Sequence, residues 1–254
     1  MPNLHSTSIS LIVPALNEEL IVGKVLSEIL QQVESHFACY ELIALNDGST
    51  DATGQIMDSI AFDNPHVKVV HNANNMGLGA SFQAGLAIAS GDYVMLLCGD
   101  GGLPARSLPA IFDKVGSADL VIPHMVNLRK IKTPLRFLLS RIYTKLLNYI
   151  SGSQLNYYNG LPVYRRVQLA NIKITSRGFG FQGEIIVKLL KSGASHVEVG
   201  VEGAEETGRS FALKPRNIFS VARTFASLTL ELLRFKAAET SILSSGISKK
   251  NESK

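Results

Sequence analysis

The sequence has few cysteines and no long apolar run. The first shortage argues against a disulfide-linked protein, and the second against a membrane-spanning one. Its two cysteines, Cys39 and Cys98, are too few for a disulfide framework and have no metal-ligand spacing. We interpret both as small buried hydrophobic residues, which suits a reducing compartment. No window approaches the roughly 18 uninterrupted apolar residues of a membrane-spanning helix. Residues 1–10 lack a basic segment followed by an apolar core, so we expect no signal peptide and a cytoplasmic protein.

Acidic residues are missing from a long central stretch. Between Leu120 and Gly183 there is no Asp or Glu, whereas ten residues are Lys or Arg. The whole chain has a net charge of +4, but outside this stretch acidic residues outnumber basic ones. A basic block of this length indicates an anionic partner, which could be phosphate, nucleic acid or an anionic membrane surface. We expect no nucleic acid, because the block lacks interleaved aromatic residues in a recognisable binding module.

Several common motifs are also absent. The sequence contains no P-loop and no G-x-S-x-G, and its six histidines show no paired spacing. Gly77-x-Gly79 matches the dinucleotide-binding G-x-G-x-x-G poorly, because it follows the third predicted strand and Phe82 replaces the last glycine. The candidate chemistry therefore has to be sought elsewhere in the chain.

Short β-rich segments alternate with helical ones along the chain. Strands are predicted at 8–13, 40–45, 67–70, 93–97, 120–122 and 196–201, the first ended by Pro14. Helices are predicted from Asn17 as N-cap, from Thr50 or Asp51 as N-cap, and at 77–90, 107–115, 134–150, 182–191 and 215–235. This alternation predicts an α/β fold, with a mostly parallel central sheet, helices on both faces and a C-terminal amphipathic helix.

The chain shows no internal repeat and no clean linker, so we expect a single domain over residues 1–236. A nucleotide-binding half would span about 8–123, and an acceptor- and membrane-facing half about 124–236. Residues 237–254 are rich in Ser and Lys and are predicted to be a disordered tail.

One carboxylate stands at the end of the fourth predicted strand. The apolar run stops at Cys98-Gly99-Asp100-Gly101-Gly102, which leaves Asp100 among glycines. Ligands of open α/β sheets bind outside the carboxyl ends of the strands, and glycine lets them approach the backbone closely. A carboxylate there can hold a divalent cation that bridges phosphate oxygens. An ordinary acidic turn on a glycine loop is the alternative.

Polar segments follow three other predicted strands and are expected at the same edge of the sheet. They are Pro14-Ala15-Leu16-Asn17-Glu18-Glu19, Asn46-Asp47-Gly48-Ser49-Thr50-Asp51 and Asn75-Met76-Gly77-Leu78-Gly79. Carboxylates there can accept from the base and ribose of a nucleoside, and helix N-termini can hold phosphate. Four polar strand ends at one edge favour a ligand site over four unrelated caps or turns.

In this order, these segments resemble the family 2 glycosyltransferases of the GT-A fold. Within that family the chain is similar to the dolichol- and polyprenyl-phosphate sugar synthases, from about Ser8 to Arg234. Further matching segments are Ala89-Ser90-Gly91-Asp92, Gly160-Leu161-Pro162-Val163-Tyr164-Arg165-Arg166, Gly178-Phe179-Gly180-Phe181-Gln182-Gly183-Glu184 and Thr207-Gly208-Arg209-Ser210.

The resemblance implies a transferase that moves a sugar from a nucleotide-diphospho-sugar to a lipid-phosphate or glycan acceptor, by inverting single displacement. The donor-binding residues it implies are Pro14, Ala15, Glu18, Asn46, Asp47, Gly77, Gly99 and Asp100. Asp100 would be catalytic and would hold Mg²⁺ or Mn²⁺, and Glu184 would be a general base for a hydroxyl acceptor. Arg165 and Arg209 would bind the acceptor phosphate.

The chain departs from the family pattern at several motif positions. Leu16 replaces an aromatic residue and Pro162 an arginine. Three acids are also replaced: one of a pair by Asn46, the first of the D-x-D motif by Cys98, and another by Asn156. These losses motivate an alternative: a catalytically degenerate GT-A protein that serves as a nucleotide-sugar-binding or membrane-associated partner subunit.

The predicted helix at 134–150 carries apolar residues on one side and basic residues on its flanks. It could dock against the sheet, or it could lie on a membrane with Lys and Arg at headgroup level. We favour peripheral contact with the cytoplasmic face of a membrane, with the helix at 215–235 as a second contact.

Overall fold

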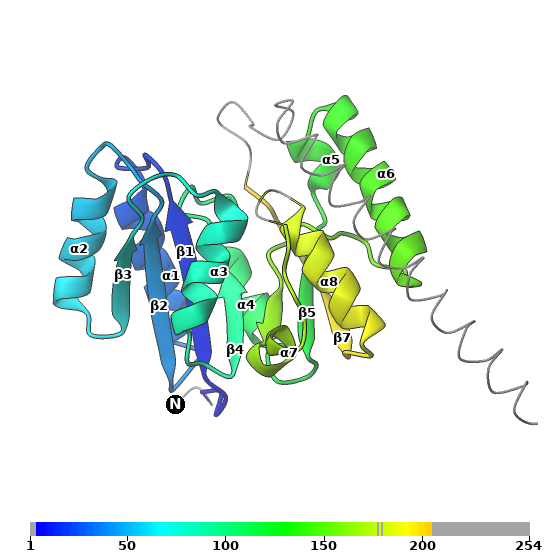
Figure 1. Cartoon of the computed structure of the whole chain (residues 1–254), viewed down its shortest axis with the longest axis horizontal. Helices are drawn as coiled ribbons and strands as arrows, with labels where there is room; N and C mark the ends of the chain where they lie inside the picture. Colours follow the sequence, from blue (N-terminus) through cyan, green and yellow to red (C-terminus); the bar gives the residue numbers. More distant parts are fainter. Residues whose placement is uncertain (1–3, 177, 179, 205–254) are drawn as a thin grey trace, which may run out of the picture.

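The computed structural model describes residues 4–176, 178 and 180–204, and it is an α/β structure built on one sheet (Figure 1). The predicted fold class is confirmed. The helix at 215–235, the tail at 237–254 and Arg209 lie outside the described residues. Within the described ranges, no helix has the length and apolar content needed to cross a membrane.

The sheet has seven strands in the spatial order β3-β2-β1-β4-β6-β5-β7. They are β1 (Ile9–Ala15), β2 (Tyr40–Asn46), β3 (Val67–His71), β4 (Tyr93–Leu96), β5 (Leu120–Met125), β6 (Val163–Arg165) and β7 (His196–Val201). β6 is antiparallel to both of its neighbours, and all other pairings are parallel. The other six strands therefore end at one edge of the sheet, which we term the carboxyl edge.

Helices cover both faces of the sheet. They are α1 (Val22–Glu34), α2 (Thr53–Asp63), α3 (Leu78–Ile88), the 3₁₀ turn η1 (Ala105–Ser107), α4 (Leu108–Phe112), α5 (Leu128–Ile131), α6 (Pro134–Ser151), α7 (Arg166–Ala170) and α8 (Phe181–Lys191). Figure 1 shows α3 and α8 in front of the sheet and α1 behind it. α6 packs against α8.

The central strands are buried on both faces. Every residue of β1 and of β4 is buried, which is why these strands read as continuous apolar runs in the sequence. In front of them, Phe82 of α3 and Phe181 of α8 are in ring contact, with centroids 5.5 Å apart. This contact joins the two helices over the middle of the sheet.

Two boundaries near the first strand differ from the prediction. β1 continues through Pro14, whose carbonyl accepts from the Gly99 N–H (3.0 Å). The side of Pro14 that lacks an N–H therefore faces the end of β4, and the β1–β2 ladder loses no bond. Asn17 does not cap α1, which begins at Val22. It has a φ of 54°, and its side chain instead accepts from the Thr50 N–H (2.8 Å).

β6 was not predicted from the sequence. Its three residues pair with β4 on one side and β5 on the other, so that Tyr164 lies opposite both Val94 and Leu120. A run of three residues carries almost no periodic signal. Pairing with β4 and β5, which are distant in the sequence, therefore makes this segment a strand.

Candidate functional site

The loops that follow β1, β2, β3 and β4 meet at the carboxyl edge, as the sequence predicted. The β1 and β2 loops are fastened to each other by side-chain hydrogen bonds. The Asn17 N–H donates to Ser49 Oγ (3.0 Å) and the Glu18 N–H donates to Thr53 Oγ1 (2.8 Å). These bonds hold the backbone of both loops, and the Glu18 carboxyl feels the charge of Asp100 on the β4 loop.

Asp47 organises the β3–α3 loop from the end of β2. Its carboxylate is buried and accepts from Asn72 Nδ2 (2.8 Å), the Met76 N–H (3.0 Å) and the Gly77 N–H (2.9 Å). Gly77 has a φ of +85°, which favours glycine, and it precedes the first residue of α3. A carboxylate offers about four lone-pair sites, and three of them are used by these internal donors. The donor-binding roles of Asp47 and Gly77 stay predictions.

Asn46 has mainly internal partners. Its Oδ1 accepts from the Ser49 N–H (2.9 Å), and its Nδ2 lies 3.1 Å from His71 Nδ1. His71 Nε2 lies 2.9 Å from Asp58 Oδ1. An amide can donate to the imidazole nitrogen when the other ring nitrogen donates to Asp58, so Asn46 suits this neighbour. The predicted contact of Asn46 with the donor stays untested.

Asp100 is exposed at the end of β4, on a loop that lies directly against β1. A Cβ on Gly99 would approach the Ala15 Cβ to 2.6 Å, so only glycine allows this contact. One Asp100 oxygen accepts from the Gly102 N–H (3.0 Å), and Gly101 has a φ of +69°. The carboxyl group is therefore held in place with its other oxygen open to a ligand.

The charges around Asp100 suit a divalent cation that the donor helps to hold. Burial raises the pKa of Glu18, and the negative charges of Asp100 and Asp51 raise it further. A cation at Asp100 would relieve this repulsion. Burial also raises the pKa of the Cys98 thiol, so Cys98 stays neutral and is no ligand for a hard cation. The described part of the chain has no cluster of three or more metal-ligating side chains. The residues fit Mg²⁺ or Mn²⁺ whose remaining ligands are diphosphate oxygens and water.

Glu184 lies in the first turn of α8 and has four donors. Its oxygens accept from the Thr175 N–H (2.9 Å), Thr175 Oγ1 (2.7 Å), the Ser176 N–H (2.7 Å) and Lys188 Nζ (2.7 Å), and only 2% of the residue is exposed. Burial would raise the pKa of Glu184, but Lys188, Thr175 and Ser176 outweigh it and lower the pKa. Its role as a general base stays a prediction, and these donors make it a poor proton acceptor.

Arg165 is not at the carboxyl edge, and its predicted role at the acceptor phosphate stays a prediction that its position does not support. β6 is antiparallel, so Arg165 lies opposite Tyr93, the first residue of β4. Its guanidinium lies over the Tyr93 ring (5.8 Å) and 3.4 Å from an Asp119 oxygen. Sequence reasoning missed this because it placed no reversed strand at 163–165. Within the described residues, Arg165 belongs to the opposite edge of the sheet.

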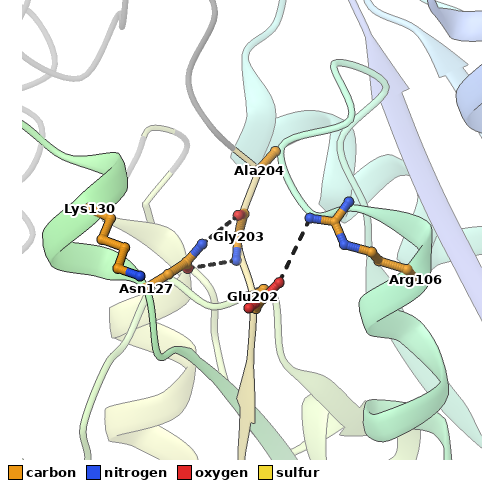
Figure 2. Close-up of a pocket in the computed structure, with 6 residues that line it drawn as sticks. All are labelled: Arg106, Asn127, Lys130, Glu202, Gly203 and Ala204. Carbon is orange, nitrogen blue, oxygen red and sulfur yellow. Dashed lines mark hydrogen bonds and ion pairs between the residues drawn. The ribbon is translucent and has the colours of Figure 1, made fainter.

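A charged hollow beside the Asp100 loop was also missed. Its volume is about 430 Å³, and it is lined by Arg106, Asn127, Lys130, Glu202, Gly203 and Ala204 (Figure 2). The Ala204 N–H lies 3.4 Å from the Gly102 carbonyl, so the hollow adjoins the loop that carries Asp100. The available signal was positional, because Asn127 follows β5 and Glu202 follows β7 at the carboxyl edge.

α6 leaves most of its apolar side uncovered by the described residues. Leu147 and Ile150 are buried, whereas Leu138 is 56% and Tyr149 is 90% exposed. The other exposed apolar residues of this helix are Leu135, Leu139, Ile142 and Leu146. The docking contact with α8 therefore accounts for only part of the apolar side chains on α6.

Comparisons with known proteins give the family. The model of the family described as "Glycosyl transferase family 2" matches residues 10–169. The polyprenol monophosphomannose synthase of Mycolicibacterium smegmatis is 30% identical over 212 residues, which cover 76% of this chain and 76% of that protein. A dolichyl-phosphate beta-glucosyltransferase of Trichomonas vaginalis is 30% identical over 147 residues, which cover 53% of this chain. The chain spans less than half the length of that relative (46%).

Solved structures share the fold. The glucosyl-3-phosphoglycerate synthase of Mycobacterium tuberculosis, in complex with Mn²⁺, uridine diphosphate and phosphoglyceric acid, superposes with a TM-score of 0.64. The match covers 89% of this chain and 78% of that chain at 20% identity. A complex of the same synthase with uridine diphosphate gives a TM-score of 0.66. At this identity the likeness shows the GT-A fold alone.

Proposed function

We propose that this chain, which belongs to glycosyl transferase family 2, transfers a sugar from a nucleoside-diphosphate sugar to a polyprenyl phosphate. The observation that carries the proposal is the exposed Asp100 carboxylate, which is held on a glycine loop where four polar strand ends converge. The curated relatives, which are named as dolichyl-phosphate and polyprenol-phosphate sugar transferases, support this acceptor class.

The nucleoside diphosphate would lie along the carboxyl edge. Pro14, Ala15 and Glu18 would contact the nucleoside from the β1 loop, and Asn46 and Asp47 from the β2 loop. Gly77 and Gly99 would let the ligand approach the backbone. Asp100 would hold Mg²⁺ or Mn²⁺ against the diphosphate, where the cation stabilises negative charge on the leaving group.

The reaction would be a single displacement with inversion. An oxygen of the acceptor phosphate attacks the anomeric carbon, the bond from that carbon to the donor diphosphate breaks, and the diphosphate leaves with the bonding electron pair. A phosphate is already an anion at neutral pH, so the step needs no general base. This agrees with the four donors that occupy Glu184.

The acceptor would be reached at a membrane surface. The exposed apolar side of α6, with Arg141 and Lys145 on its flanks, suits shallow insertion beside anionic headgroups. We propose peripheral attachment to the cytoplasmic face. Co-sedimentation with phosphatidylglycerol vesicles tests it, and Leu138→Ser with Tyr149→Ser should reduce binding. Leu20→Ser, at an exposed leucine outside α6, should not.

Calorimetric titration with UDP and GDP, each with and without Mn²⁺, tests donor binding. Metal-dependent binding to one of them is expected, and transfer from the matching sugar nucleotide should fall about 100-fold or more in Asp100→Ala. Asp113→Ala, at another exposed acid, is the matched control. Full activity of Asp100→Ala would overturn the metal role.

A second candidate function is favoured by Cys98. A neutral thiol stands where the family pattern has an acid, which fits a degenerate protein that binds nucleotide sugar or a partner subunit without transferring sugar. Nucleotide binding without transfer or hydrolysis of any sugar donor would favour this candidate. Turnover by the purified protein would exclude it.

A further inference from the structure

A series of hydrogen bonds joins α2 to the β2 loop through His71. His71 Nε2 lies 2.9 Å from Asp58 Oδ1 of α2, and His71 Nδ1 lies 3.1 Å from Asn46 Nδ2. Asn46 Oδ1 in turn accepts from the Ser49 N–H (2.9 Å). Asn46 and His71 are the last residues of β2 and β3 and lie opposite each other in the ladder. A Cβ on Gly54 would approach Asn46 Nδ2 to 2.6 Å, so the first turn of α2 lies directly against the amide.

Only one arrangement of protons satisfies all of these bonds. The Ser49 N–H can only donate, so the side-chain oxygen of Asn46 faces it and the NH₂ group faces His71. An ionised carboxylate can only accept, so the ring proton of neutral His71 lies on Nε2, toward Asp58. Nδ1 then has a free lone pair and accepts from Asn46. The complete series of bonds therefore requires a neutral His71.

A second proton on the His71 ring breaks this series. The imidazolium donates from both nitrogens, so its Nδ1–H would face the Asn46 NH₂ group, which is also a donor. Rotation of the amide would restore a bond to His71 but would set the NH₂ group against the Ser49 N–H. One hydrogen bond is lost in either case.

Asp58 is the charged group that contacts His71 within the described residues. It favours the imidazolium, but the two side chains are 45% and 57% exposed, so solvent screens the pair. Asp63 lies five residues further along α2 and therefore on a different side of that helix. Side chains alternate between the faces of a strand, which puts Lys68 of β3 and Glu41 of β2 on the other face, where they pair with each other (2.6 Å).

The bond from Ser49 closes the turn that carries Asp47. The Asp47 carboxylate accepts from the N–H groups of Met76 and Gly77 and so holds the start of α3. Ser49 Oγ accepts from the Asn17 N–H (3.0 Å) and ties the turn to the β1 loop. Opening of the turn would therefore loosen three loops that meet at the carboxyl edge.

We propose that His71 is a positioning residue whose neutral form holds the β2 loop, and that its protonation weakens nucleotide binding at the carboxyl edge. The effect on the nucleotide rests on the proposed function, whereas the effect on the Ser49 turn does not. One neutral hydrogen bond is lost, so nucleotide affinity should fall about 3- to 10-fold between pH 8 and pH 5.5, the range in which histidine gains a proton. The sensitivity depends on Asn46, because a carboxylate there would accept from the imidazolium.

Nuclear magnetic resonance of the full chain without nucleotide tests the hydrogen bonds themselves. With ¹⁵N-labelled histidine at pH 8, His71 should carry its proton on Nε2, and the Nδ1–H tautomer would overturn the inference. Between pH 8 and pH 5.5 the Ser49 amide resonance should shift together with His71 in the wild type and should lose this shift in His71→Gln. His196→Gln, at an exposed histidine of β7, should behave as the wild type does.

Calorimetric titration with UDP and GDP in the presence of Mg²⁺, at pH 8 and at pH 5.5, measures the effect on the nucleotide. The diphosphate itself gains a proton in this range, so the quantity compared is the ratio of the two Kd values for each variant. This ratio should be about 3- to 10-fold larger in the wild type and in His196→Gln than in His71→Gln. In Asn46→Asp it should fall below the wild-type ratio, because the carboxylate accepts from protonated His71. Equal ratios in the wild type and His71→Gln would refute the inference.

The two measurements separate this inference from the proposed function. A Ser49 amide that follows His71 in a protein that binds neither nucleotide would support the positioning role and count against the transferase. Nucleotide binding with equal ratios, together with a Ser49 amide that does not respond to pH, would refute the positioning role while the transferase stands.

Discussion

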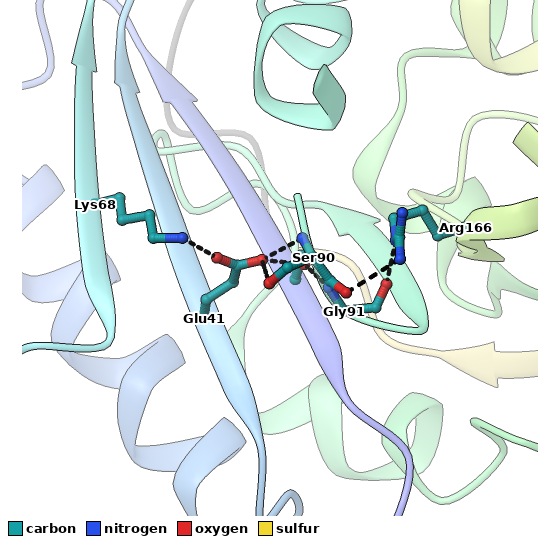
Figure 3. Close-up of polar contacts among 6 residues, drawn as sticks. Glu41, Lys68, Ser90, Gly91 and Arg166 are labelled. Carbon is teal, nitrogen blue, oxygen red and sulfur yellow. Dashed lines mark hydrogen bonds and ion pairs between the residues drawn. The ribbon is translucent and has the colours of Figure 1, made fainter. Parts of the chain in front are cut away.

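Glu41 joins several strands through one buried carboxylate, and its removal has a calculable effect on stability. The residue lies in the second position of β2 and is 8% exposed. One oxygen accepts from Ser10 Oγ (2.7 Å), the Ser90 N–H (2.6 Å) and Ser90 Oγ (2.8 Å), and the other accepts from Lys68 Nζ (2.6 Å). Figure 3 shows the contacts of Glu41 with Lys68 and Ser90, and beside them Arg166, which donates to the carbonyls of Ser90 and Gly91.

The pKa of Glu41 sets the size of the effect. Burial would raise this pKa, but hydrogen bonds from Lys68, Ser10 and Ser90 outweigh it and lower the pKa from 4.5 to about 2. At about 1.4 kcal/mol per pKa unit, the full shift corresponds to roughly 3 kcal/mol. Lys68 is half exposed, so solvent screens part of this interaction. We therefore expect Glu41→Gln to lower the free energy of unfolding by about 2 kcal/mol at pH 7.

Equilibrium unfolding in urea at several pH values measures this effect. The folded pKa is lower than the unfolded one, so the stabilisation is present above about pH 4.5 and is lost as the pH falls toward 2. The difference between the wild type and Glu41→Gln should shrink over that range. Glu28→Gln, which removes an exposed partner of Lys24 at 3.7 Å, should change stability by less than about 0.5 kcal/mol. Equal stability of wild type and Glu41→Gln at pH 7 would refute the reasoning.

Two further substitutions test the site. Gly99→Ala places a Cβ 2.6 Å from the Ala15 Cβ and should push the Asp100 loop away from β1. Donor affinity should then fall about 10-fold or more, and the free energy of unfolding by about 1–3 kcal/mol. Titration with the donor nucleotide and thermal unfolding measure the two effects, and an unchanged affinity would contradict the role of this contact. Glu184→Gln should lower stability at neutral pH, because it removes the charge that Lys188 faces, and that loss should diminish in acid as the wild-type pKa is passed. The same variant should keep most of its kcat with a phosphate acceptor; a pH profile of kcat that loses its acidic limb would instead identify Glu184 as the base.

Much of the fold could be predicted because its signals are local. Short apolar runs and helices with one apolar side predicted six of the seven strands and the longer helices, whereas the short helices α5 and α7 were not predicted. The loop residues of the donor site followed from the direction of parallel strands, since all their carboxyl ends share one edge. The start of α1 could not be predicted in this way, because Asn17 bonds to the β2 loop instead of capping its own helix.

Two departures from the family pattern, Asn156 and Asn46, contact residues that are distant in the sequence. Asn156 donates its backbone N–H and its side-chain amide to Glu198 (2.7 and 3.0 Å), so an acid at 156 would face another acid. Asn46 likewise has an imidazole beside it. Each partner is more than twenty residues away in the chain, at a distance where sequence patterns carry no information on contact.

The sequence by itself determined the α/β alternation, the polar ends of the strands and the solitary carboxylate Asp100, because each depends on residues close together in the chain. Tertiary structure decided which charges share a site. The insertion of β6 between β4 and β5 carried Arg165 to the opposite edge, and the segment before α8 supplied three of the four donors around Glu184. The segments that follow β4, β5 and β7 brought Arg106, Lys130 and Glu202 to one hollow. These arrangements depend on strand pairing and packing between distant segments, which no local pattern encodes.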